Sequence, residues 1–184
     1  MNDWLMLAFG LALTVGTGIF VASEFSMLNL ERNEIEARAE RGEKGLSSTI
    51  RALKRTATHL SGAQLGITLT TMLTGFLAEP ALSHMLETKV SPVVALVLTM
   101  FITTLFSTLF GELVPKKLAL TLPLEVNRFV VNFQLAFTLV FSWMIAILNA
   151  AGNGIVRAMG IEPKEELSSA RTAEELSSLV RRSA

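Results

Sequence analysis

Four long runs without a charged residue limit what this chain can fold into. They span Trp4–Ser23, Leu60–Ala78, Val90–Gly111 and Phe129–Val156, and contain 20, 19, 22 and 28 residues. A helix of roughly 20 apolar residues crosses the hydrocarbon core of a bilayer, so each run is long enough to span a membrane. The first run is a poor secretory signal, because Asp3 precedes it and no Lys or Arg does. The chain is therefore expected to be an all-α membrane protein.

The composition supports this fold class and narrows the function. Charged residues make up 17% of the chain, whereas a typical soluble domain has about 25%. The formal net charge is zero, so no nucleic-acid partner is expected. The absence of cysteine excludes disulfides and thiolate metal sites, and the two histidines, His59 and His84, lack metal-ligand spacing. No nucleophile–base pair, phosphate loop or nucleotide fingerprint is visible, so we do not expect an enzyme.

The distribution of Lys and Arg predicts the orientation. Residues 31–57 contain seven of them, the N-terminal tail has none, and loop 79–89 has only Lys89. Basic residues accumulate on the cytoplasmic side of a membrane, so the N-terminus is expected outside and segment 31–57 inside. Glycines within that segment divide it into two short cytoplasmic helices. The expected transmembrane spans are about 4–29, 60–79 and 90–113.

The fourth run leaves two alternatives. If it crosses the membrane, five basic residues of the C-terminal tail lie outside, against the usual rule. If it does not cross, residues of about 123–158 form a long juxtamembrane helix, and the C-terminus is cytoplasmic. The polar residues within this run and the Gly152–Gly154 break favour the second arrangement. Residues 1–160 are then the transmembrane domain, and residues 161–184 are a cytoplasmic linker.

The third run ends in a carboxylate close to a proline. Pro115 has no N–H, so in an α-helix the carbonyl of Gly111 has no donor. This carbonyl and the side chain of Glu112 are hard oxygen ligands, the kind that Mg²⁺ and Ca²⁺ bind. Lys116 and Lys117 mark the cytoplasmic edge. The alternative is that Pro115 is an ordinary stop signal and that the charged residues only anchor the helix at the membrane edge.

Polar side chains form a stripe on each of the first three spans. Hydroxyls in membrane helices often bond their own backbone or hold helices together, but three converging stripes predict a polar cleft for a cation. We expect one divalent cation near Glu112 in each protomer. Its candidate ligands are Ser23, Ser26, Asn29, Thr68, Thr71, Gly111 and Glu112. Gln64, Gly75 and Pro115 are expected to shape the site.

Several of these segments resemble, in order, the motifs of the CorC/CNNM family of magnesium transporters. Phe20-Val21-Ala22-Ser23-Glu24-Phe25 resembles the first-helix signature of the family, and Gln64-Leu65-Gly66-Ile67-Thr68-Leu69 resembles the second-helix motif. Gly111-Glu112-Leu113-Val114-Pro115-Lys116 resembles the third-helix motif, and Thr172-Ala173-Glu174-Glu175-Leu176 resembles the stretch before the paired CBS domains. Some relatives carry Ser where this chain has Val21, so the first-helix ligand is Ser23, Ser26 or Asn29.

The resemblance implies a homodimer in the plasma membrane, with three spans and a belt-like juxtamembrane helix in each protomer. It implies Mg²⁺ export with inward Na⁺ movement as the driving force. It also implies regulation by ATP through cytosolic CBS domains, which this chain lacks. A different class of function stays open: a non-transporting membrane anchor and dimeriser that couples CBS sensing to another ion transporter.

Overall fold

The computed structural model describes residues 2–161, and every regular element in that range is a helix. The helices are α1 Asp3–Leu28, α2 Arg32–Glu40, α3 Ser47–Leu53, α4 Thr56–Glu87, α5 Pro92–Phe106, the π-helix η1 Ser107–Leu113, α6 Val114–Thr121, α7 Pro123–Val140 and α8 Ser142–Ala158. The chain divides into two units after Ile145. The first unit contains α1 to α7 and the start of α8, and the described part of the second is 146–161. The linker predicted for 161–184 and its Thr172–Leu176 stretch lie almost wholly outside the described residues.

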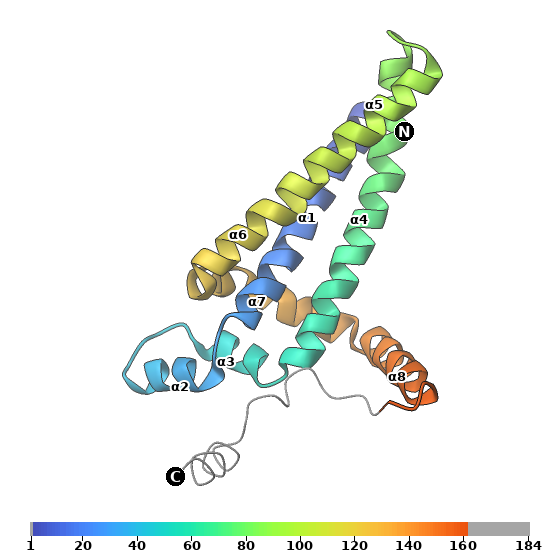
Figure 1. Ribbon diagram of the computed structural model, residues 1–184. Coiled ribbons are helices and arrows are strands. Elements are labelled where there is room, and N and C mark those ends of the chain that lie inside the picture. The colour runs from blue at the N-terminus through green and yellow to red at the C-terminus, as the bar shows by residue number, and fades with distance from the viewer. Residues whose placement is uncertain (1, 162–184) are drawn as a thin grey trace, which may run out of the picture. The chain divides into compact units, whose positions relative to one another are not determined.

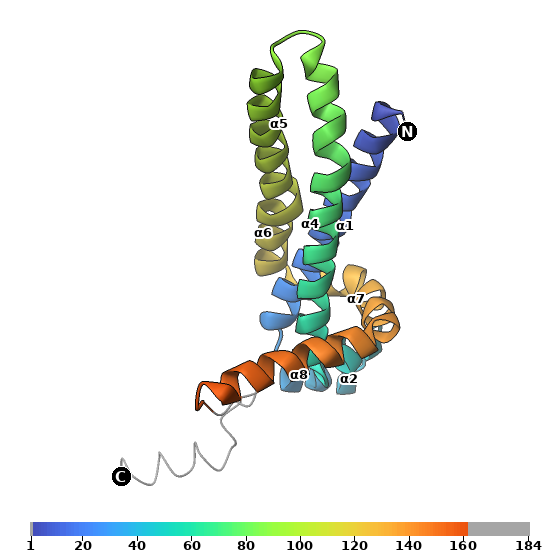
Figure 2. The ribbon, with the colours of Figure 1, turned by 90° about the vertical axis from the view of Figure 1, so that its right-hand side faces the viewer.

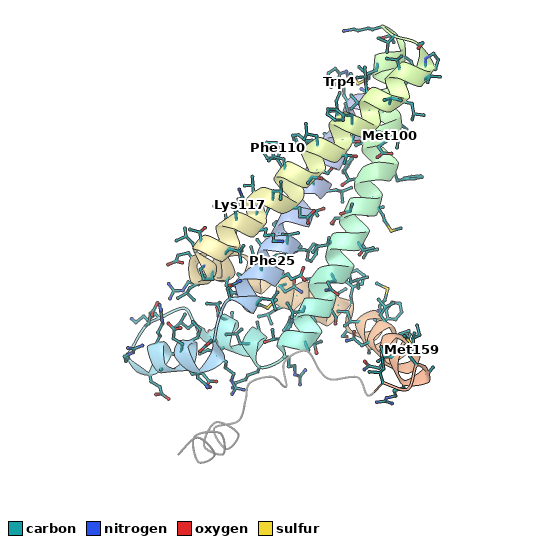
Figure 3. All side chains as sticks on the ribbon, in the orientation of Figure 1. Trp4, Phe25, Met100, Phe110, Lys117 and Met159 are labelled. Carbon is teal, nitrogen blue, oxygen red and sulfur yellow. The ribbon has the colours of Figure 1, made fainter. Side chains whose placement is uncertain are left out.

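The long helical segments of the first unit lie side by side as a bundle (Figures 1 and 2). α1 packs along α4, and α5, η1 and α6 follow one another as a third segment beside them. One end of this bundle carries the α4–α5 connection and is called here the loop end. At the opposite end, called here the α7 end, α7 crosses the bundle, and α2 and α3 lie beside it. Trp4 lies near the loop end and Lys117 lies near the α7 end (Figure 3).

Three described segments are long and apolar enough to cross a membrane: Asp3–Leu28, Thr56–Glu87 and Pro92–Thr121. Their outward faces are apolar and exposed. On α5, for example, Val93 and Phe101 are 73% and 67% exposed. Apolar side chains at such exposure are stable in lipid and costly in water. The prediction of an all-α membrane protein with three transmembrane helices is therefore confirmed by the number, length and composition of these segments.

Two prolines lie inside continuous helical segments. The second helix extends from Thr56 to Glu87, past the expected end at 79, with Pro80 inside it. The third segment continues through Pro115 to Thr121. A proline removes one backbone hydrogen bond, and neighbouring helices in a bundle support the helix on both sides of that gap.

The expected single helix over about 123–158 is two helices. It breaks at Phe141, and α7 and α8 meet there with a bend of 76°. Only as this bent pair do they pass the length and composition test for a span. No Gly or Pro lies near residue 141, so the sequence carries no local signal for the break. That the pair does not cross the membrane stays a prediction.

An apolar core at the α7 end holds the short helices against the bundle. It joins the end of α1, α2, α3, the start of α4, and α7 through Met27, Ile35, Leu46, Ala52, Leu53, Leu60, Leu124 and Val131. Gly42 and Gly45 have φ angles of 93° and 82°, a conformation that favours glycine, and they allow the chain to reverse between α2 and α3. The α7 end is thus fixed by packing.

Candidate functional site

A groove of about 570 Å³ lies between α1, α4 and η1. It is called here the polar groove. Its lining residues are Thr14, Thr17, Val21, Glu24 and Phe25 from α1, Gln64, Ile67, Thr68, Thr71 and Thr74 from α4, and Ser107, Thr108, Gly111 and Glu112 from η1. Most of these residues offer a side-chain oxygen, and two are carboxylates. Each of the three long segments therefore contributes oxygen atoms to one space.

The α1 wall of the groove is a single helical face. Thr14, Thr17, Val21 and Glu24 follow one another at spacings of three, four and three residues, which places them on the same side of the helix. The Thr14 hydroxyl donates to the Gly10 carbonyl at 3.0 Å. The Thr17 hydroxyl lies 2.8 Å from Oγ1 of Thr70 on α4. These bonds leave hydroxyl lone pairs as acceptors along the groove.

The α4 wall places three of the predicted residues together. Gln64, Thr68 and Thr71 all line the groove, at spacings of four and three residues. The Thr68 hydroxyl donates to the Gln64 carbonyl at 2.9 Å, so its oxygen remains an acceptor. The predicted stripe on the second span is therefore present as a surface, although its role in binding a cation stays a prediction.

Every groove residue from the third segment lies in the π-helix. Ser107, Thr108, Gly111 and Glu112 all fall within η1, and at its end the N–H of Val114 donates to the carbonyl of Leu109, five residues back. π-helical turns are rare, and they often occur at functional sites. The wider turn changes which side chains of this segment share one face, and here three polar side chains and Gly111 line the groove with α1 and α4.

Pro115 lies two residues beyond the end of the π-helix. In an α-helical register the proline lies opposite the Gly111 carbonyl, as predicted from the sequence. In the π register it lies opposite the Phe110 carbonyl, one residue earlier. A Cβ added at Gly18 would lie 3.0 Å from Cγ of Pro115 and 3.3 Å from this Phe110 oxygen. Gly18 therefore lets α1 approach the register change closely. Whether Gly111 offers its carbonyl to a cation stays a prediction.

Three predicted residues do not line the polar groove. Ser23 and Ser26 are buried on the side of α1 that meets α7, where Nδ2 of Asn127 donates to Oγ of Ser26 at 3.1 Å. Ser26 is two residues beyond Glu24, which rotates it by about 200° around the helix axis. Asn29 is the C-cap of α1, and its side chain donates to the Phe25 carbonyl at 2.8 Å.

Two of the residues expected to shape the site also lie outside the lining. The nearest side chain to Gly75 is that of Glu79, on its own helix. Pro115 lies close to Gly18 of α1. It is expected to affect the groove only by changing the backbone hydrogen-bond pattern of its own helix. Only Gln64, of the three residues expected to shape the site, lines the polar groove itself.

The structure adds a second carboxylate to the one expected. Glu24 lines the polar groove together with Glu112. Among residues 2–161, no three His, Cys, Asp or Glu side chains gather as a metal cluster. The donor set is therefore two carboxylates surrounded by hydroxyl, amide and carbonyl oxygens, which suits a hard cation and not a soft one. Nζ of Lys116 lies 4.4 Å from the ring centroid of Phe25, which is itself a lining residue of the groove.

Glu24, Thr14 and Thr17 were not among the predicted ligands. Their spacing in the sequence indicates that they belong together, because it places them with Val21 on one helical face. The predicted ligands of the first helix, Ser23, Ser26 and Asn29, do not belong to this face. Which of the two faces meets α4 and η1 is decided by tertiary packing, which the spacing alone does not contain.

Comparisons with known proteins agree with this architecture. Residues 8–184 match the family described as the Cyclin M transmembrane N-terminal domain. The chain is 46% identical over 183 residues to UPF0053 protein MT1890 of Mycobacterium tuberculosis (strain CDC 1551 / Oshkosh), covering 95% of this chain and 40% of that protein. It is 33% identical over 175 residues to uncharacterized protein MT1889 of the same strain, covering 92% and 51%.

A shorter match connects the chain to a third protein. It is 36% identical over 77 residues to UPF0053 protein YhdT of Bacillus subtilis (strain 168), covering 42% of this chain and 17% of that protein. The chain thus spans about half or less of the length of each of these relatives.

Proposed function

This chain belongs to the Cyclin M transmembrane N-terminal domain family, and from that premise we propose that it is the membrane domain of a Mg²⁺ transporter. Mg²⁺ binds oxygen ligands in a near-octahedral arrangement and gives up its waters reluctantly. The polar groove supports the proposal, because it gathers two carboxylates and several neutral oxygens from three transmembrane segments. The charge of two ionised carboxylates would balance that of one Mg²⁺ ion.

Glu112 is the centre of the proposed site. It lies in the π-helix, next to Gly111 and close to the register change at Pro115. Glu24, Thr68 and Thr71 line the same groove and are the proposed partners from the other two segments. Ser23, Ser26 and Asn29 do not line this groove, so they are not among the proposed partners. Intramembrane carboxylates are costly to keep in a bilayer, which favours a functional role over a structural one.

The orientation and direction of transport are further parts of the proposal. The distribution of basic residues supports a cytoplasmic α7 end and an N-terminus on the outside of the plasma membrane. By resemblance to the CorC/CNNM family, Mg²⁺ would leave the cell as Na⁺ enters. By the same resemblance, the working unit would be a homodimer, regulated by ATP bound to CBS domains elsewhere in the protein.

The experiment that tests this function is Mg²⁺ flux by purified protein in liposomes, with and without a Na⁺ gradient. The wild type should move Mg²⁺, and Glu112→Gln, which keeps the shape and removes the charge, should lower the flux to background. Glu40→Gln is a matched control, because Glu40 is exposed on α2 and away from the groove. Normal flux by Glu112→Gln would mean that Glu112 only anchors the helix at the membrane edge.

The second candidate function is a non-transporting anchor that couples CBS sensing to another transporter. The observation that favours it is the bonding of the hydroxyls: Thr14, Thr68 and Thr74 each donate to a carbonyl of their own helix. Hydroxyls used in this way also occur in membrane helices without any ligand. An anchor should show no flux in liposomes of the wild type, whatever ion gradient is applied.

A further inference from the structure

One face of α7 carries three buried polar side chains. Asn127, Gln134 and Thr138 follow at spacings of seven and four residues, and Asn127 and Gln134 are each 0% exposed. Buried amide groups are costly unless they are hydrogen-bonded. Nδ2 of Asn127 and Nε2 of Gln134 each donate to another helix, whereas Oδ1 and Oε1 of the same two residues have no protein partner among the described residues. The helices that accept these two bonds are α1 and α4, which form two walls of the polar groove.

Asn127 joins α7 to α1. Its Nδ2 donates to Oγ of Ser26 at 3.1 Å, and the Ser26 hydroxyl donates to the Ser23 carbonyl at 3.0 Å. All three residues are buried. The chain of hydrogen bonds therefore ends on the backbone of the residue directly before Glu24, the carboxylate that α1 contributes to the groove. A rotation of α1 about its axis would move Glu24 and break this chain at the same time.

Gln134 and Thr138 join α7 to α4. Nε2 of Gln134 donates to the His59 carbonyl at 2.9 Å, and Nδ1 of His59 lies 3.0 Å from Oγ1 of Thr138. A Cβ added at Gly62 would lie 2.8 Å from the same Thr138 oxygen. α7 therefore packs closely against the backbone of α4 at His59. This residue lies five positions before Gln64, which lines the groove.

From these contacts we propose that Asn127 is a positioning residue of the cation site, and that α7 sets the rotation of α1 relative to α4 through it. This inference rests on the proposed function. Asn127 does not touch the groove; it acts on Glu24 through Ser26 and the α1 backbone. Gln134 supplies the second fixed point, on α4. The distance between the carboxylate of Glu24 and the oxygens of α4 and η1 then depends on α7.

The test is the Mg²⁺ dependence of flux in liposomes, together with Mg²⁺ titration of the purified protein in detergent. Asn127→Ala should raise the apparent KM for Mg²⁺ by about tenfold, the range found when residues that orient metal ligands are removed. The maximal flux should fall much less. Asn132→Ala is the matched control, because Asn132 lies on the same helix and is exposed. It should leave the KM within about twofold of the wild type.

A double-mutant cycle separates positioning from direct ligation. Ser26→Ala removes the same contact from the α1 side, so Ser26→Ala and the double variant Asn127→Ala/Ser26→Ala should both resemble Asn127→Ala. If Ser26 itself binds the cation, Ser26→Ala will raise the KM much more than Asn127→Ala does, and the proposal is wrong. If Asn127→Ala does not give a monodisperse protein, the KM of Ser26→Ala decides.

The outcomes distinguish this inference from the function on which it rests. A wild type that neither binds nor moves Mg²⁺ contradicts both. A wild type that transports, with Asn127→Ala equal to Asn132→Ala in KM, contradicts only the positioning role. A lower maximal flux at unchanged KM in Asn127→Ala would also overturn it, because that result indicates a loss of folded protein without a change of the site.

Discussion

Glu24 and Ser26 are two residues apart, and they face different partners. Glu24 lines the polar groove between α1, α4 and η1, whereas Ser26 is buried against α7. A helix turns by about 100° per residue, so neighbouring polar residues in one motif serve different surfaces. The first-helix motif therefore combines two tasks: it supplies a carboxylate to the groove, and it fixes the helix that carries that carboxylate.

At this scale we predict that Glu24 contributes to cation binding. Glu24→Gln keeps the size of the side chain and removes its charge, so the affinity of purified protein for Mg²⁺ should fall by about tenfold, equivalent to roughly 1.4 kcal/mol. Mg²⁺ titration in detergent measures this change, and Glu40→Gln serves as the exposed control. A Glu24→Gln variant with the affinity of the wild type would exclude Glu24 from the site.

At the scale of elements, η1 is the part of the fold that the sequence least suggests. Its seven residues lie within an otherwise α-helical segment of apolar composition. Pro115 lacks the N–H that would continue an α-helical register, and Gly18 on α1 gives the register change the space it needs. The π-helix η1 therefore depends on Pro115 in its own segment and on the space that Gly18 of α1 leaves beside it.

We predict that Pro115→Ala weakens Mg²⁺ binding by changing this register. Alanine restores the missing N–H, so the segment can return to an α-helix and rotate its groove residues by about 100° relative to α6. The affinity for Mg²⁺ should fall, while the temperature of unfolding should stay the same or rise. Pro123→Ala is the control, since Pro123 opens α7, where no helical donor is needed. Unchanged affinity in Pro115→Ala would separate the π-helix from the site.

At the scale of the whole molecule, several glycines allow helices of the same chain to pack closely against one another. A Cβ added at Gly10 would lie 2.7 Å from Cβ of Ala78, and one at Gly66 would lie 2.5 Å from the ring of Phe20. Close packing by glycine therefore joins helices of one chain. The exposed apolar side chains of α1, α4 and α5 are then available to meet lipid or a second copy.

We predict a two-fold dimer, with the same surface used by both copies and one complete site in each protomer. Each polar groove is formed by α1, α4 and η1 of a single chain, so dimerisation is not needed to complete it. Light scattering in mild detergent should give the mass of a dimer. A monomer that persists at high protein concentration would contradict the prediction.

The topology can be tested because the chain has no cysteine of its own. Single cysteines at Ser168 and Ser183 should resist a membrane-impermeant thiol reagent in intact cells, since a crossing by residues 129–156 would place five basic residues outside. A cysteine at Ser91, in the exposed α4–α5 connection, should react and serves as the positive control. Labelling of Ser168→Cys from outside would require a fourth span.

The sequence by itself determined the helices that cross the membrane, because the cost of placing charge in lipid is a local property of each run. Three runs of 19 to 22 uncharged residues became three transmembrane segments. The polar stripes on α4 and on the third segment were also readable, since helical spacing places Gln64, Thr68 and Thr71 on one face. The sequence also singled out Glu112, and the structure places it in the groove lining, although its role as a ligand stays a prediction.

The tertiary structure decided which face of each helix meets which neighbour. The faces of α1 that carry Glu24 and Ser26 are both polar, and only packing against α4, η1 and α7 assigns one to the groove and the other to Asn127. The break at Phe141 likewise has no Gly or Pro to mark it. Local composition fixes where a helix can exist in a membrane, but its rotation depends on contacts between residues far apart in the chain.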